Sequence, residues 1–200
     1  MIEVEIKVHV TDEQAGALIA GAQFVSEELL VNEYYDSPDY QLTTKGFWLR
    51  RRNGNFELKY PATKDGSFHS GKNSPMYEVT DEPEIRKILG LRMNCTFQEA
   101  LAYAGYSILY RFTTMRKKYT KDGFTIDFDH ADFGDLVYCI CEVEKLVDSV
   151  DQTEQAFESL YVFVKQYGIS TERVEGKLGY YIRIKHPDHY YALVNSSKHE

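Results

Sequence analysis

The stretch that decides the fold is the first one, Ile2-Glu3-Val4-Glu5-Ile6-Lys7-Val8-His9-Val10. Apolar and polar side chains alternate strictly along it, which predicts a β-strand with two unlike faces. One face is wholly aliphatic, and the other carries Glu3, Glu5 and Lys7, whose charged groups could converge on one ligand. A half-buried strand whose charges simply face water is the alternative at this point.

Pairs of charged residues on one face recur in later segments that read as strands. The pairs are Arg50/Arg52, Glu57/Lys59, Arg116/Lys118, Asp127/Asp129 and Glu142/Glu144. Like charges held side by side repel, so counter-charges or ligands must face them. Spread over several antiparallel strands, these faces predict a closed β-barrel with a charged lumen and with helices packed on its outer apolar surface. A barrel with merely solvated ionic faces is the alternative.

Turn and helix signals divide the rest of the chain. Asn53-Gly54 and Asp122-Gly123 each lie between two strand-like runs and predict β-hairpins. Capping residues and apolar periodicity predict helices at 11–20, 83–89, 97–106, 151–167 and 187–194. Pro61–Ser74 is polar and predicts a mobile loop. Residues 175–182 fit either a strand or a helix.

Bulk composition sets outer limits on function. The 200 residues suit one domain, which we expect to span 1–200. The formal charge of −8 argues against a general nucleic-acid binder. The three cysteines, Cys95, Cys139 and Cys141, lack zinc-site spacing, and the last two lie on the strand face away from Glu142 and Glu144, which predicts packing roles. We find neither a signal peptide nor a membrane span, so we expect a cytoplasmic protein without membrane or nucleic-acid partners.

The charged faces offer two complementary sets of side chains. The cations suit phosphate oxygens, because arginine makes bidentate contacts and lysine supplies a point charge. This set is Lys7, Arg50, Arg52, Lys59, Arg116 and Lys177. The carboxylates suit hard divalent cations such as Mg²⁺ or Mn²⁺. This set is Glu3, Glu5, Glu78, Asp127, Glu142 and Glu144. A polyphosphate with a bridging metal ion needs both.

Several motifs, in order, resemble those of the CYTH, or triphosphate tunnel metalloenzyme, superfamily. Glu3-Val4-Glu5-Ile6-Lys7 matches its Glu-x-Glu-x-Lys signature. Further matches are Tyr34-Tyr35-Asp36-Ser37-Pro38, where Ser37 replaces a usual Thr, Trp48-Leu49-Arg50-Arg51-Arg52, Glu57-Leu58-Lys59, residues 127–134 and Glu142-Val143-Glu144. Lys177-Leu178 and Leu193-Val194-Asn195-Ser196-Ser197 resemble the animal branch that acts on thiamine triphosphate. The resemblance covers nearly the whole chain and is weakest at 86–107.

The resemblance implies an α+β fold, a closed antiparallel eight-stranded tunnel that binds a triphosphate with Mg²⁺, or with Mn²⁺. It implies a metal-dependent hydrolase that cleaves the terminal phosphoanhydride of thiamine triphosphate, and we expect a monomer. An inorganic tripolyphosphatase, a class IV adenylyl cyclase and a polyphosphate-binding module without catalysis are the alternatives, because one fold hosts several activities.

Roles for single residues follow from the same resemblance. The six cations named above would bind phosphates, with Lys7, Arg52, Lys59 and Arg116 as the catalytic set, and the six carboxylates would hold or orient metal and water. Trp48 would stack on the thiazolium ring, since a cation over an indole face is a favourable contact. A barrel-wall aromatic is the alternative for Trp48.

Overall fold

The computed structural model describes residues 1–62 and 74–196. Within these residues, eight antiparallel strands close into a barrel in the order β1-β5-β4-β3-β2-β6-β7-β8. The strands are β1 (Ile2–Val8), β2 (Gln23–Asp36), β3 (Trp48–Arg52), β4 (Asn55–Pro61), β5 (Met76–Val79), β6 (Ser107–Lys121), β7 (Phe124–Asp132) and β8 (Val137–Val147). The predicted closed eight-stranded α+β barrel is confirmed. The predicted loop at Pro61–Ser74 falls mainly on 63–73, outside the described residues.

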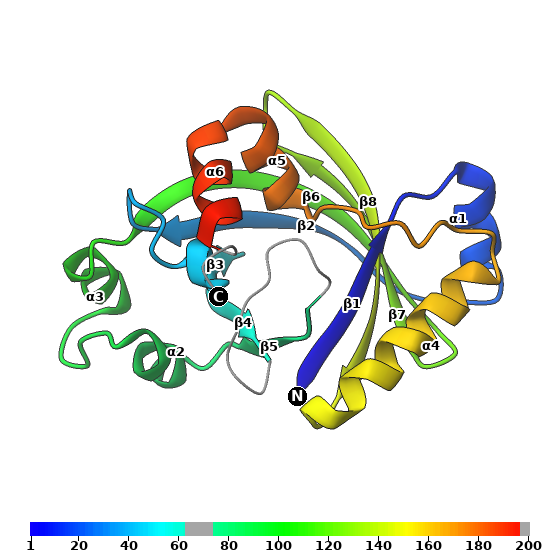
Figure 1. Ribbon diagram of the computed structural model, residues 1–200, viewed down its shortest axis with the longest axis horizontal. Helices are drawn as coiled ribbons and strands as arrows, with labels where there is room; N and C mark the ends of the chain where they lie inside the picture. The colour runs from blue at the N-terminus through cyan, green and yellow to red at the C-terminus, as the bar shows by residue number, and fades with distance from the viewer. Residues whose placement is uncertain (63–73, 197–200) are drawn as a thin grey trace.

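Helices lie around the barrel between and beyond the strands (Figure 1). They are α1 (Asp12–Ile19), η1 (Thr43–Lys45), α2 (Glu82–Leu89), α3 (Phe97–Tyr103), η2 (Val150–Gln152), α4 (Thr153–Lys165), α5 (Lys177–Lys185) and α6 (Pro187–Ser196). All five predicted helices are present, and the ambiguous segment at 175–182 is the helix α5. None of the described helices is both long and apolar enough to cross a bilayer.

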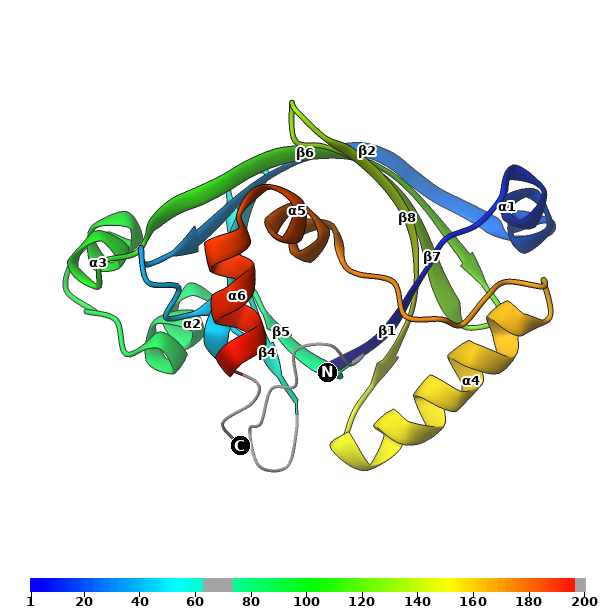
Figure 2. The same ribbon diagram turned by 45° about the horizontal axis from the view of Figure 1, so that its top comes forward.

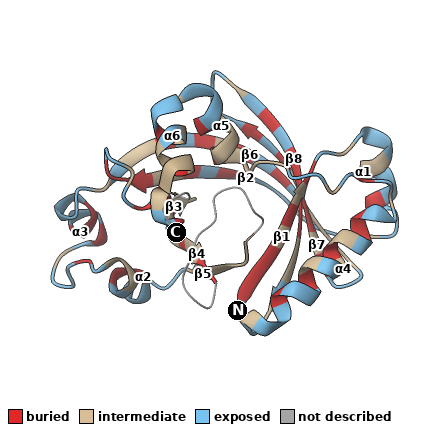
Figure 3. Ribbon diagram, in the orientation of Figure 1, coloured by how far each residue is buried: buried red, intermediate tan, exposed pale blue. Residues whose placement is uncertain are grey.

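β1 closes the barrel, with its aliphatic face turned outward into a core. It pairs with β8 along its full length and with β5 only at Ile2↔Tyr77 and Glu3↔Met76. Val4, Ile6 and Val8 pack with residues of α1 and α4, and the buried stripe of β1 is visible in Figure 3. The apolar face therefore lies outside and the charged face lines the lumen, as the alternation predicts.

A second core covers the β3–β4 hairpin. Leu49 and Leu58 pack with Ile85 of α2 and Leu101 of α3, and all four side chains are fully buried or nearly so. The hairpin turns at Asn53-Gly54, where both residues have positive φ (47° and 89°). This conformation is the one that Asn-Gly favours in two-residue turns, so the predicted hairpin is confirmed.

α5 and α6 lie on the concave side of the sheet formed by β2 and β6 (Figure 2). Leu178 and Ile182 of α5 and Leu193 of α6 pack against Tyr110 and Phe112 of β6. The inward face of β6 is thus aromatic toward one end and ionic toward the other. Two helices therefore line the lumen, whereas the sequence predicted helices only on the outer surface of the barrel.

Candidate active site

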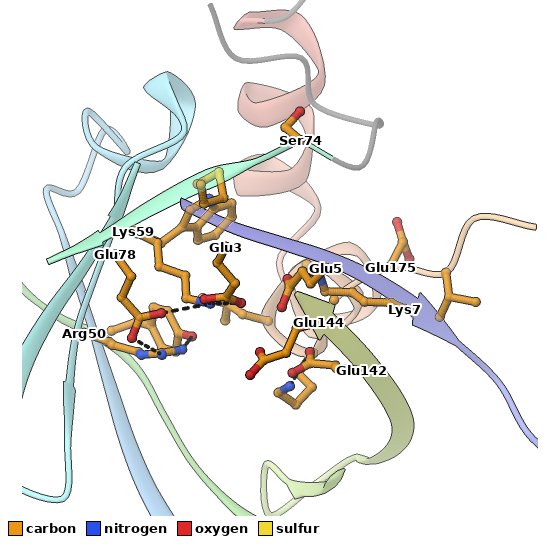
Figure 4. A pocket seen from close by; sticks show the side chains of 18 of the residues that line it. Glu3, Glu5, Lys7, Arg50, Lys59, Ser74, Glu78, Glu142, Glu144 and Glu175 are labelled. Atoms are coloured by element: carbon orange, nitrogen blue, oxygen red, sulfur yellow. Dashed lines mark hydrogen bonds and ion pairs between the residues drawn. The ribbon is translucent and has the colours of Figure 1, made fainter. Parts of the chain in front are cut away.

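One large cavity of about 840 Å³ runs into the barrel. Its walls come from every strand except β7, and from α5 and α6. Twelve of the thirteen predicted site residues line it, namely Glu3, Glu5, Lys7, Trp48, Arg50, Arg52, Lys59, Glu78, Arg116, Glu142, Glu144 and Lys177. The exception is Asp127, which is completely buried behind the wall. Many of the lining side chains converge in Figure 4.

Three carboxylates gather at the junction of β1 and β8. Glu5 lies opposite Glu144 in the strand register, and one oxygen atom from each of Glu3, Glu5 and Glu144 lies within 4.8 Å of the others. Burial, together with the charge of Glu3, raises the pKa of Glu144 to about 7. Three crowded carboxylates form an oxygen-rich donor set that suits Mg²⁺ or Mn²⁺, so the residues present fit the implied metal ion.

Lysine side chains lie beside this carboxylate triplet. The Lys59 ammonium contacts both oxygens of Glu3, at 2.7 and 2.8 Å, and one oxygen of Glu78 at 3.1 Å. Lys7 donates to Glu5. Burial alone would lower the pKa of Lys59, but nearby glutamates outweigh it and raise that pKa, so the ammonium stays charged.

Arg50 and Arg52 project from β3 into the cavity but are neutralised to different extents. The Arg50 guanidinium contacts Glu57 at 2.6 Å and Glu78 at 3.7 Å, and it donates to the Tyr34 hydroxyl at 3.3 Å. Arg52 reaches Glu57 only at 3.6 Å. Burial and the neighbouring charge of Arg50 lower the pKa of Arg52. Arg52 therefore keeps unmet positive charge that an anion in the cavity would offset.

The opposite wall is a dense network around Arg116. Its guanidinium contacts Asp127 at 2.5 Å, Asp129 at 2.6 Å and Glu142 at 2.7 Å. Lys177, at the start of α5, contacts Asp129 at 2.5 Å and Glu142 at 2.6 Å. Two cations thus share three carboxylates, and the ionic contacts fasten α5 to the barrel wall.

Asp127 belongs to this network but is completely buried beneath Arg116 and Lys118, so it does not line the cavity. Burial raises the pKa of Asp127, although Arg116 and Lys118 oppose the shift. One of its oxygens, Oδ1, has no hydrogen-bond partner among the described residues. Direct contact between Asp127 and a metal ion stays a prediction, and the carboxylate triplet of β1 and β8 is the better-placed donor set.

Four residues of the site were absent from the predicted set, namely Tyr34, Glu57, Lys118 and Asp129. Glu57, Lys118 and Asp129 each share a strand face with a predicted residue, so alternation alone could have found them. Tyr34 lies on β2, which carries no predicted site residue, so alternation gave no such signal for it. Tyr34 faces the cavity, whereas Tyr35 is buried in the second core. Both strand cysteines lie on the outer face, with Cys141 buried under α4 and Cys139 exposed.

A closed antiparallel barrel with an ionic cavity is the architecture that the sequence motifs predicted. Comparison with known proteins supports the same assignment. A family model described as the CYTH domain matches residues 1–177, and the chain belongs to this family. Human thiamine-triphosphatase is 28% identical over 184 residues, which cover 82% of this chain and 77% of the human protein.

Solved structures share the fold. A protein from Pyrococcus horikoshii OT3 aligns with a TM-score of 0.60 and 24% identity, over 86% of this chain and 94% of its own. A putative adenylyl cyclase from Hippeastrum, described as having a dominant triphosphatase activity, aligns with a TM-score of 0.57 and 15% identity, over 92% and 95% of the two chains.

Proposed function

We propose that this protein is a metal-dependent hydrolase that converts thiamine triphosphate to thiamine diphosphate and phosphate. The observation that carries the proposal is the cavity that unites the carboxylate triplet Glu3, Glu5 and Glu144 with the under-neutralised Arg52. A metal-bound triphosphate needs both groups. The likeness to human thiamine-triphosphatase supports this choice of substrate.

The basic side chains would grip the phosphate oxygens. Among the described residues, Arg52 reaches a carboxylate only at 3.6 Å. Lys7 and Lys59 lie next to the carboxylate triplet, where the phosphates and the metal ion would meet. Charged donors held in place before substrate arrives lower the barrier, because no reorganisation is needed as charge shifts in the transition state. Positioning of this kind supplies most of the catalysis in phosphoryl transfer.

Mg²⁺ or Mn²⁺ held by the triplet would neutralise phosphate charge and acidify a bound water. Glu3, Glu5 and Glu144 would hold the metal ion, and their oxygens would orient the attacking water. Histidine and cysteine are absent from the described lining residues. We therefore propose direct in-line attack by water on the terminal phosphorus, without a covalent intermediate on the protein.

Trp48 would receive the thiazolium of the substrate. Its side chain is half-buried and lines the cavity on the same strand as Arg50 and Arg52. A cationic aromatic ring stacked on the indole would gain both dispersion and cation–π attraction. We further propose that residues 1–200 act as one domain and as a monomer, since α5 and α6 complete the wall of the cavity.

The test is a phosphate-release panel with thiamine triphosphate, inorganic tripolyphosphate and ATP, each with Mg²⁺, with Mn²⁺ or with chelator. We expect the highest kcat/KM for thiamine triphosphate and loss of turnover with chelator. A strong preference for tripolyphosphate would favour the alternative function, an inorganic tripolyphosphatase. The triphosphatase activity described for the Hippeastrum protein is the reason to test this alternative. Cyclic AMP from ATP would indicate a cyclase. Tight binding without phosphate release would indicate a binding module.

A further inference from the structure

A buried polar network joins the C-terminal helix α6 to the barrel, and the reaction does not use it. His189 of α6 is completely buried. Its Nε2 lies 2.7 Å from Thr43 Oγ1 in η1, and its Nδ1 lies 2.7 Å from the Tyr110 hydroxyl on β6. The Tyr40 ring stacks on the imidazole, with 3.8 Å between centroids and 3° between planes. One side chain therefore joins α6 to two separate segments, the turn at 40–43 and β6.

The direction of every hydrogen bond in this network can be assigned. The Thr43 hydroxyl and the Thr43 N–H both donate to Asp36 Oδ2, at 2.7 and 3.0 Å. A hydroxyl has one proton, so Thr43 Oγ1 accepts from His189 Nε2–H. His189 Nδ1 then accepts from the Tyr110 hydroxyl. The imidazole is thus neutral in a single tautomer, in accord with burial that lowers the pKa of His189 to about 4.

The turn that receives His189 is built for this contact. Asp36 also accepts from the N–H groups of Ser37 and Leu42, each at 2.8 Å. Tyr40, whose ring covers the imidazole, has a φ of 63°, in the left-handed region that non-glycine residues rarely adopt. Such strain persists only where the surroundings enforce it. Asp36, in the Asp36-Ser37-Pro38 motif, thus fixes the turn against which His189 of α6 packs.

α6 carries its other side chains to the cavity. Tyr190, Leu193 and Val194 line the cavity, as does Trp48 of β3. Trp48 and Tyr190 pack against the buried cluster that contains Leu193. This part of the wall has no ionic side chain among those four residues, in contrast to the carboxylate triplet and the arginines. A purely inorganic phosphate chain would gain nothing from an apolar wall, whereas an organic group joined to it would.

We propose that α6 is the wall that selects triphosphates with an aromatic or apolar organic group, and that His189 is the positioning residue that fixes this wall. For thiamine triphosphate the inference rests on the proposed function. His189 itself does not line the cavity, so it acts only through the placement of α6. Lys7, Arg52 and Lys59, which we propose grip the phosphates, belong to β1, β3 and β4, whereas the hydrogen bonds of His189 go to η1 and to the Tyr110 end of β6.

The test compares His189→Phe with the wild-type protein, using thiamine triphosphate, ATP and inorganic tripolyphosphate. Phenylalanine keeps a ring against Tyr40 but removes both hydrogen bonds. We expect KM for the preferred organic triphosphate to rise about tenfold. This factor corresponds to the net free energy of about one hydrogen bond, which would no longer hold α6 in place. We expect kcat and the KM for tripolyphosphate to stay within about twofold, a margin set by the same affinity arithmetic.

Two further variants make the result specific. His189→Gln restores one donor and one acceptor and should recover part of the lost affinity. Tyr191→Ala, on the same helix but 70% exposed, should leave all constants unchanged. If His189→Phe does not fold, His189→Gln and Tyr190→Ala replace it, and both should raise KM selectively for the organic substrate.

Different outcomes overturn different claims. Equal changes of KM for the organic and inorganic substrates, or no change for either, would overturn the role of α6 and His189. If the wild-type protein prefers ATP to thiamine triphosphate, the proposed substrate is wrong, while a selective effect of His189→Phe on ATP would support the inference. If no organic triphosphate binds the wild-type protein in calorimetry, both claims fall.

Discussion

At the scale of single residues, neighbouring arginines on β3 have opposite tasks because strand geometry sends them to opposite faces. Arg52 lines the cavity, whereas Arg51 pairs with Glu33 at 2.5 Å and does not line it. We expect Arg52→Ala to lower kcat/KM about 100-fold or more, as loss of a preorganised charge partner does elsewhere. Arg51→Ala is the matched control and should retain activity within about threefold, since Arg51 lies outside the cavity and its partner Glu33 does too.

Both variants would be assayed for phosphate release and for thermal unfolding. Among the described residues, Arg52 has no carboxylate closer than 3.6 Å and donates one hydrogen bond of 3.2 Å to Asn32, so its removal should change stability little. Full activity in a folded Arg52→Ala protein, or equal losses in the two variants, would contradict the assignment of the cavity as the active site.

Glu144 predicts an unusual dependence of stability on pH. Its pKa is raised from 4.5 to about 7 by burial and by Glu3. Between those values the unfolded chain has released the proton that the folded protein still holds. The metal-free protein should therefore lose stability as pH rises from about 4.5 to 7, with a ceiling on the order of 3 kcal/mol. Glu144→Gln cannot ionise and should lack this contribution.

The measurement is the free energy of urea unfolding in chelator, from pH 4.5 to 8, for the wild-type protein and Glu144→Gln. The advantage of the variant should grow as pH rises and then level off above pH 7. Glu158→Gln, at an exposed position on α4, is the control. A difference that stays constant with pH would show that Glu144 is ionised throughout.

At the scale of elements, α4 supports the strands that carry the carboxylates. Leu160 of α4 is completely buried with Val4, Ile6 and Val143 of β1 and β8. We expect Leu160→Ala to cost about 2–5 kcal/mol of unfolding free energy, because it removes apolar contacts and leaves a cavity. Activity well below the melting temperature should stay within about twofold, since the charged faces of those strands point away from α4.

Val162→Ala is the matched control on the same helix. Val162 is 59% exposed, so its truncation should change stability by less than about 0.5 kcal/mol. Urea unfolding monitored by circular dichroism measures both variants. A similar small effect for Leu160→Ala would mean that α4 does not hold the barrel wall in place.

At the scale of the whole molecule, the sequence predicted what depends on local alternation and missed what depends on distant contact. The faces of Glu5, Arg52 and Glu144 follow from a period of two, and the closed fold follows from the motifs. The complete burial of Asp127 could not be read from β7, because alternation assigns it to the face of Asp129 but does not show that Arg116 and Lys118 of β6 cover it. The docking of His189 onto Thr43 joins segments 146 residues apart and leaves no local pattern.

The crowding of like charges in one lumen also predicts a response of the entire barrel to its ligand. Without substrate, the carboxylate triplet and Arg52 carry charge that the protein neutralises only in part. We expect tripolyphosphate with Mg²⁺ to bind the folded barrel alone, because the unfolded chain has no such site. At a ligand concentration of 100 times the dissociation constant, binding should add about 2.7 kcal/mol to the free energy of unfolding and raise the melting temperature by several degrees.

Differential scanning fluorimetry measures the shift of the melting temperature. The shift should shrink in Arg52→Ala and at high salt, where charges are screened. Equal shifts with sulfate at the same ionic strength would show a general salt effect and contradict a specific polyphosphate site.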